Sequence, residues 1–192
     1  MGELDDSLNS EERRILLAIA RQALEESVRG EPLSNLDLEN LPPRLIEPGA
    51  TFVTLTINKE LRGCIGALEV TQPLAEDVRI HAVAAGLEDY RFPPVQPDEL
   101  PEISIEISRL TAPQLSECND AEDLLKRLRP GVDGVVLKEG NRRATFLPQV
   151  WEKVPEPEKF LSMLCQKMGA PPDYWRGGTV EIFTYQVEEF HE

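Results

Sequence analysis

Leu61-Arg62-Gly63-Cys64-Ile65-Gly66 is the stretch around which the rest of the chain is organised. Just upstream, Phe52-Val53-Thr54-Leu55-Thr56-Ile57 alternates apolar and polar side chains, which is typical of a strand with one buried face. The two runs are separated by Asn58-Lys59-Glu60, which is suited to a three-residue turn. Together they predict an antiparallel hairpin.

The register of this hairpin decides which side chains meet. A turn of three residues puts the apolar residues on one face, in these pairs: Ile57 with Leu61, Leu55 with Gly63 and Val53 with Ile65. On the other face, Arg62 is expected opposite Thr56 and Cys64 opposite Thr54. Neighbouring residues on one face of a strand are about 6–7 Å apart, so a guanidinium could lie over the thiol. Such a cation favours thiolate, the reactive form of cysteine.

Two interpretations of these residues stay open on the pattern alone. Gly63 and Gly66 either bend a strand or mark the close approach of another backbone or a ligand. Cys64 is either a small buried hydrophobe or a reactive thiol.

The composition is that of a globular protein with one substantial core, or with two small subdomains that share one. The chain has 192 residues, of which 41% are hydrophobic and 29% are charged. No apolar run approaches the about 20 residues that cross a bilayer, and the acidic start of the chain lacks the pattern of a secretory signal. We therefore expect a cytoplasmic protein with no membrane partner.

The charge balance bears on the class of partner. The net charge is −15, from 35 acidic and 20 basic residues, and no run of five Lys or Arg occurs. A surface this negative repels phosphate backbones, so nucleic acid is an unfavourable direct partner.

Cysteine and histidine are too few and too scattered for most metal sites. The three cysteines are widely spaced without a C-x-x-C pair, and there are two histidines. This pattern argues against a disulfide framework and a structural zinc site. Cys165 lies on the apolar stripe of the helix expected over residues 156–168, so we expect it in the core. We expect no metal site and no cofactor bound by the chain alone.

The remaining segments predict an α+β fold with a mixed, mostly antiparallel sheet and flanking helices. The first expected helix has Ser10 as its N-cap and Glu11 and Glu12 in its first turn. Two more helices are expected to begin near Pro73 and Glu156, and a short fourth helix is capped by Asn119 or Asp120. Further strands are expected over residues 103–108, in a hairpin over residues 134–147, and over residues 179–187. We expect a single domain over residues 1–192, with residues 1–9 as a flexible tail.

Two titratable side chains are candidates for moving protons. His81 falls on or beside the apolar stripe of the second helix, where a hydrogen-bonded core histidine is more common than a catalyst. Glu106 projects from the polar face of the strand over residues 103–108, where most glutamates are simply solvated.

Four blocks of the sequence resemble the AMMECR family, whose prokaryotic members are called AmmeMemoRadiSam system protein A. Leu-Arg-Gly-Cys-Ile-Gly is similar to the family's signature string. Residues 88–95 resemble its Asp-Pro-Arg-Phe-Pro-Pro stretch, except that Tyr90 stands at the first proline. Asp89 and Arg91 of this stretch are close enough in sequence to pair. Residues 144–151 and 164–175 resemble two further blocks. The resemblance covers most of the chain from about residue 12 onward.

The resemblance implies a larger and a smaller subdomain around a shared cavity. It also implies that one site is lined by five residues: Arg62, Cys64, Arg91, Phe92 and Gln149. Family members occur with a Memo-like protein, similar to non-haem iron dioxygenases, and with a radical-SAM protein. The family has also been described as a predicted RNA-modification factor. A fold and a site follow from this resemblance, but not a reaction.

Two functions from different classes fit these observations about equally. In the first, the chain is a cysteine-dependent enzyme for a small anionic substrate. Cys64, activated by Arg62 or Arg91, attacks the substrate while Glu106 or His81 moves protons. The substrate-binding residues are then Gly63, Gly66, Arg91, Phe92 and Gln149.

In the second function, the chain is a non-catalytic binding or assembly component that works with the Memo-like and radical-SAM proteins. RNA modification ranks third because of the negative charge.

Overall fold

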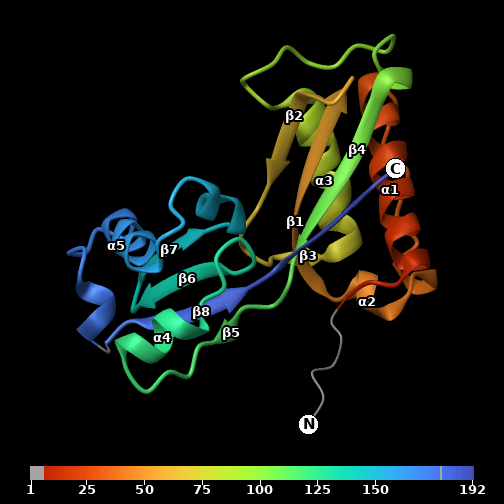
Figure 1. Cartoon of the computed structure of the whole chain (residues 1–192). Helices are drawn as coiled ribbons and strands as arrows, with labels where there is room; N and C mark the ends of the chain where they lie inside the picture. Colours follow the sequence, from red (N-terminus) through yellow and green to blue (C-terminus); the bar gives the residue numbers. More distant parts are fainter. Residues whose placement is uncertain (1–6, 178) are drawn as a thin grey trace. The chain divides into compact units, whose positions relative to one another are not determined.

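The computed structural model describes residues 7–177 and 179–192. The chain forms two compact units, divided between Leu110 and Thr111 and again between Val187 and Glu188. Of the described residues, 7–110 and 188–192 belong to the first unit, and 111–177 and 179–187 belong to the second. Figure 1 shows the elements of both units. The α+β class with antiparallel sheets is confirmed.

The first unit is built on a sheet with the strand order β2-β1-β4-β9. Its strands are β1 (Pro48–Ile57), β2 (Glu60–Gly66), β4 (Ile103–Leu110) and β9 (Val187–His191), and the short β3 (Gln72–Pro73) pairs with the start of β1. Its helices are α1 (Ser10–Val28), α2 (Pro43–Ile46) and α3 (Leu74–Leu87), with 3-10 turns η1 (Leu38–Asn40) and η2 (Leu100–Glu102). The predicted strand over residues 103–108 is thereby confirmed.

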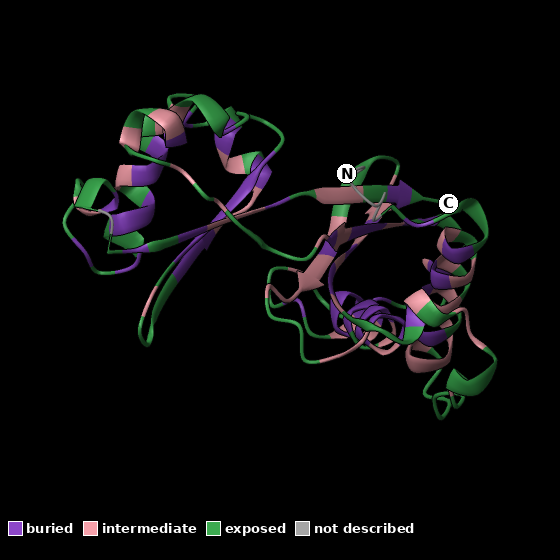
Figure 2. Cartoon of the chain, turned by 90° about the horizontal axis from the view of Figure 1, so that it is seen from below, coloured by how far each residue is buried: buried purple, intermediate pink, exposed green. Residues whose placement is uncertain are grey.

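Helices α1 and α3 pack on one face of this sheet. The core joins apolar residues of both helices to Val53 and Leu55 of β1 and to Ile105 and Ile107 of β4. Nine of the fourteen residues of α3 are buried (Figure 2). The alternation along β1 and β4 therefore buries one face and leaves Thr54 and Glu106 on the other.

The start of α1 differs from the expectation. Asn9, rather than Ser10, is the N-cap, and its side chain accepts hydrogen bonds from the N–H groups of Glu11 and Glu12. Glu12 completes a capping box by accepting the N–H of Asn9 at 2.8 Å. Both first-turn glutamates are placed as predicted.

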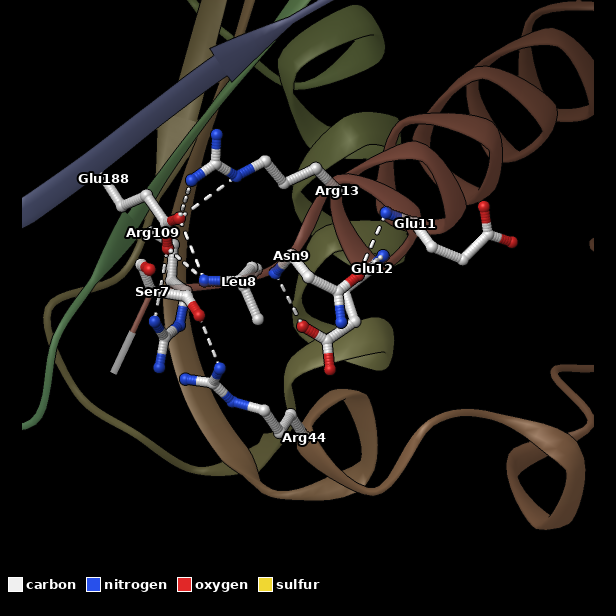
Figure 3. Close-up of polar contacts among 9 residues, drawn as sticks. All are labelled: Ser7, Leu8, Asn9, Glu11, Glu12, Arg13, Arg44, Arg109 and Glu188. Atoms are coloured by element: carbon white, nitrogen blue, oxygen red, sulfur yellow. Dashed lines mark hydrogen bonds and ion pairs between the residues drawn. The ribbon is translucent and has the colours of Figure 1, made fainter. Parts of the chain in front are cut away.

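Residues 7–9 are held against the first unit, in contrast to the tail expected over residues 1–9. Leu8 is 2% exposed. Its backbone N–H donates to Glu188 of β9 at 3.0 Å, and the same carboxylate accepts from Arg13 at 2.7 Å and Arg109 at 3.3 Å (Figure 3). Residues 1–6 of that predicted tail lie outside the described residues.

The β1–β2 hairpin has a shorter turn than predicted. Asn58 and Lys59 both have positive φ, at 53° and 68°, which makes a two-residue turn. Ile57 therefore pairs with Glu60, and Thr56 with Leu61. A bulge then restores the predicted pairing over the rest of the hairpin: Leu55 with Gly63, Thr54 with Cys64 and Val53 with Ile65.

The second unit has its own sheet with the order β5-β8-β6-β7. Its strands are β5 (Gln114–Leu115), β6 (Gly134–Glu139), β7 (Arg142–Phe146) and β8 (Glu181–Tyr185). Its helices are α4 (Ala121–Arg127) and α5 (Pro157–Lys167), with 3-10 helices η3 (Pro148–Glu152) and η4 (Tyr174–Gly177). Asp120 caps α4, as one of the two predicted alternatives.

Two predictions for the second unit have different outcomes. Cys165 of α5 is fully buried in its core, as the apolar stripe predicts. The strand expected over residues 179–187 is confirmed in part, because β8 covers residues 181–185, but a separate strand in the other sheet, β9, begins at Val187. Among the described residues, no helix has both the length and the apolarity to cross a membrane.

Candidate functional site

Cys64 lies in a row of three side chains that crosses three strands. Thr54 of β1 pairs with Cys64 of β2 on one side and with Glu106 of β4 on the other. Directly opposite residues share a face of the sheet, so all three point away from the helices. The Thr54 hydroxyl donates to the Cys64 sulfur at 3.3 Å. Glu106 is two strands from Cys64, about 10 Å at the backbone, with Thr54 between them.

The backbone of Cys64 is held at the open edge of the sheet. β2 is the end strand, so the outward N–H and C=O groups of Cys64 have no neighbouring strand. The N–H donates to the Asp89 carboxylate at 2.8 Å, and the C=O accepts from the Arg91 guanidinium at 3.2 Å. These two side chains take the place of the missing strand.

Asp89 and Arg91 are bound to each other as well as to Cys64. Two nitrogens of the guanidinium donate to the carboxylate at 2.9 and 2.6 Å. Asp89 is 4% exposed. The Arg91 hydrogen bonds hold the pKa of Asp89 far below its usual value, and Asp89 in turn raises the pKa of Arg91. The expected pairing of Asp89 with Arg91 is confirmed.

Arg62 is positioned by the bulge in β2. Thr56 pairs with Leu61, so Arg62 has no partner across the hairpin, and the expected position opposite Thr56 is wrong. Its guanidinium instead forms two hydrogen bonds with Glu99, at 2.7 and 3.0 Å. These bonds lower the pKa of Glu99 and raise that of Arg62. Arg62 therefore binds a carboxylate, and its expected place beside the thiol stays a prediction.

His81 is a hydrogen-bonded core residue. It is 9% exposed, and its Nδ1 lies 3.1 Å from the buried carboxylate of Asp77. Asp77 also accepts from the N–H and hydroxyl groups of Thr51 at 2.8 and 2.7 Å. This cluster ties α3 to β1, in agreement with the core interpretation of His81.

Gly63 and Gly66 are explained by contacts within the protein. A Cβ on Gly63 would lie 2.1 Å from the backbone oxygen of Ala85 in α3. A Cβ on Gly66 would lie 2.4 Å from both the Phe52 side chain and the Thr51 oxygen. Both glycines permit close backbone approach, as one of the two interpretations had it. Ligand contact at these positions stays a prediction.

The other two expected substrate-binding residues, Phe92 and Gln149, belong to different units of the chain. Phe92 is half-buried, and its ring centre lies 5.6 Å from the Arg91 guanidinium carbon. Gln149 belongs to the 3-10 helix η3 of the second unit, so its place beside Cys64 stays a prediction. Glu99 was missed by the sequence analysis, because it is one of several acids in its segment.

In residues 7–177 and 179–192, no group of three or more His, Cys, Asp and Glu side chains is arranged to hold a metal ion.

Comparison with known proteins places the chain in a family. The AMMECR1 family model matches residues 17–190. The chain belongs to the AMMECR1 family. A protein of Methanothermobacter thermautotrophicus is 40% identical over 191 residues, covering 96% of each chain. Protein MK0488 of Methanopyrus kandleri is 36% identical over 202 residues, covering 100% of this chain and 92% of its own.

One solved structure is also similar to this chain. The crystal structure of the uncharacterised protein PH0010 from Pyrococcus horikoshii matches with a TM-score of 0.74 and 32% identity. The match covers 96% of this chain and 93% of that one.

Proposed function

We propose that the chain is a binding or assembly component whose contact surface is the edge of β2 at Cys64 together with residues 88–102. Following the family resemblance, its partners are the Memo-like protein and the radical-SAM protein. One observation carries the proposal. Both motif arginines, Arg62 and Arg91, are held in bidentate pairs with carboxylates that fasten residues 88–102 to β2. Their positions therefore suit building a surface better than activating a thiol.

The same ion pairs indicate which ligand charge fits this surface. The positive charge of a guanidinium that is already paired with a carboxylate is largely neutralised, so it attracts a small anionic substrate only weakly. Glu106 adds a further carboxylate to the row at Cys64. A neutral or cationic group therefore fits this surface better than the expected anion.

A cysteine-dependent enzyme is the second candidate. The hydrogen bond from Thr54 to the Cys64 sulfur favours it, because a hydroxyl donor stabilises negative charge on sulfur. Glu106 lies beyond Thr54 as a proton acceptor. RNA modification ranks third, because the net charge of −15 opposes binding to a phosphate backbone.

Direct binding tests the proposal. The purified chain is immobilised, and the Memo-like and radical-SAM proteins of the same genome are passed over it separately and together. Wild type should bind, and Cys64→Ser should bind within about twofold of wild type, because the thiol is not the contact that carries affinity. Asp89→Asn should weaken binding by about tenfold, because it releases residues 88–102 from β2.

Glu31→Gln serves as the matched control, because Glu31 is an exposed carboxylate outside this surface. Circular dichroism confirms that each variant is folded. Wild type that binds neither protein contradicts the proposal. Loss of binding in Cys64→Ser alone supports the thiol-dependent candidate instead.

A further inference from the structure

Residues 88–102 form an unusually long connection between α3 and β4 (the long yellow-green loop at the top of Figure 1). We call it the 88–102 loop. Apart from the short η2 it contains no helix or strand, and it contains four prolines. Loops of this length without structure of their own are uncommon in compact domains and are usually functional.

The 88–102 loop is fixed at several points along its length. Near its start, Asp89 and Arg91 bind the backbone of Cys64. In its middle, the buried Val95 donates its N–H to the Gly86 oxygen at 2.9 Å. Near its end, Glu99 holds Arg62. A loop fixed in this way loses little conformational entropy when it binds a partner.

Tyr90 projects from this fixed loop into solvent. It is 94% exposed, although its two neighbours, Asp89 and Arg91, are both tied to β2. In the part of the chain that the structure describes, no hydrogen bond holds its hydroxyl group. Tyrosine is enriched at binding hot spots, because it offers a large face with few rotatable bonds.

The 88–102 loop, which contains Tyr90, is acidic. The 88–102 loop contains five acidic residues and one basic residue, Arg91. Arg91 and the neighbouring Arg62 are both bound by carboxylates of the loop. Three of its carboxylates have no ion-pair partner in residues 7–177 and 179–192: Glu88, Asp98 and Glu102. A negative field beside an open aromatic face complements a cation.

We propose that the 88–102 loop docks a basic segment of a partner protein, with a lysine or arginine of that segment over the Tyr90 ring and near Glu88. This inference rests on the proposed binding function and adds the chemistry of the partner. Asp89 and Arg91 hold Tyr90 in place, and the unpaired carboxylates attract the basic segment.

The test uses an acetylated eight-residue Arg-Gly repeat peptide with a fluorescent label, and a Glu-Gly repeat of equal length as the control probe. Anisotropy titrations at low salt should show binding of the Arg-Gly peptide only. Added salt should weaken this binding, because the attraction is partly screened. Tyr90→Ala should weaken it by about fivefold, whereas Tyr90→Phe should stay within about twofold because the ring is kept.

Charge variants distinguish the effect of the loop's carboxylates from that of the overall negative charge of the chain. Glu88→Gln should weaken binding by about threefold, and Glu31→Gln by less than about twofold. No binding of the Arg-Gly peptide, or equal binding by wild type and Tyr90→Ala, overturns the inference.

The two proposals can fail separately. If the Arg-Gly peptide binds through Tyr90 but neither the Memo-like nor the radical-SAM protein binds, the proposed function fails and the preference for a basic segment stands. If those proteins bind equally well to wild type and Tyr90→Ala, the proposed function stands and this inference fails.

Discussion

The carboxylate of Asp89 accepts the backbone N–H of Cys64 at 2.8 Å, across 25 residues of chain. Because β2 is the end strand of its sheet, this bond closes an edge that is otherwise open to another chain. Arg91 completes the closure by binding both Asp89 and the Cys64 oxygen. Asp89 and Arg91 thus both act on the strand that contains residues 61–66.

Replacement of Asp89 should destabilise the first unit. Asp89→Asn removes a buried charge that holds the Arg91 guanidinium and the Cys64 N–H, so we expect a loss of about 2–4 kcal/mol in the free energy of unfolding. Urea titration at pH 7 measures it. Glu31→Gln, at an exposed carboxylate, is the control and should change stability by less than about 0.5 kcal/mol. An Asp89→Asn variant as stable as wild type contradicts the role assigned to the pair.

The Asp89–Arg91 pair should also contribute to acid sensitivity. Arg91 lowers the pKa of Asp89 in the folded protein, so the unfolded chain binds a proton more readily. The contribution is therefore fully present above the unfolded pKa of about 3.9 and is lost as pH falls towards the folded value. The stability difference between wild type and Arg91→Gln should shrink as the pH falls from about 5 to about 3, a range that spans the unfolded pKa of Asp89. A difference that stays constant over this range would argue against the coupling.

The contact between Gly63 and α3 should tolerate no side chain. Gly63→Ala puts a Cβ 2.1 Å from the Ala85 oxygen, and a backbone atom can move away only if α3 shifts. We expect a loss of about 3 kcal/mol or more, or failure to fold. Gly177→Ala is the matched control, because nothing lies within 4 Å of its Cβ position. It should change the unfolding free energy by less than about 0.5 kcal/mol.

The β1–β2 turn offers a stabilising substitution. Lys59 has a φ of 68°, a conformation that costs a residue with a side chain about 1 kcal/mol relative to glycine. Lys59→Gly should therefore raise the free energy of unfolding by about 0.5–1 kcal/mol. Gly131→Ala, at a φ of 80°, should have the opposite effect. Thermal and urea unfolding of the two variants, compared with wild type, check both signs.

The three cysteines should differ in their reaction with iodoacetamide. Cys165 is fully buried and burial raises the pKa of its thiol, whereas Cys64 and Cys118 are partly exposed. Peptide mass spectrometry of the folded protein should find modification at Cys64 and Cys118 only, and at all three in urea. Rapid modification of Cys165 in the folded protein contradicts the assigned core.

Local patterns in the sequence predict most of the fold. The alternation over residues 52–57 and 103–108 predicted β1 and β4, since a half-buried strand repeats every two residues. The turn of the first hairpin is one residue shorter than predicted, because nothing in the sequence indicates that Lys59 adopts a positive φ. Past the turn, the bulge in β2 restores the predicted strand register, so Cys64 still pairs with Thr54.

The site was less predictable than the fold. Asp89 and Arg91 are two residues apart, so their pairing could be predicted from the sequence. The partner of Arg62 could not, because Glu99 is 37 residues away and resembles the other acids of its loop. The chain end shows the same limit, since β9 follows the expected last strand and joins the other sheet through contacts that no local pattern records.

Hydrogen exchange at the Cys64 amide decides whether Asp89 and Arg91 close the edge of β2 and fix the 88–102 loop. NMR exchange rates should show protection of this amide in wild type, although it lies on an end strand. In Asp89→Asn the rate should rise by about 100-fold, while core amides of β4 change only with global stability. A Cys64 amide that exchanges freely in wild type, or at the same rate in both proteins, would contradict this structure of the site.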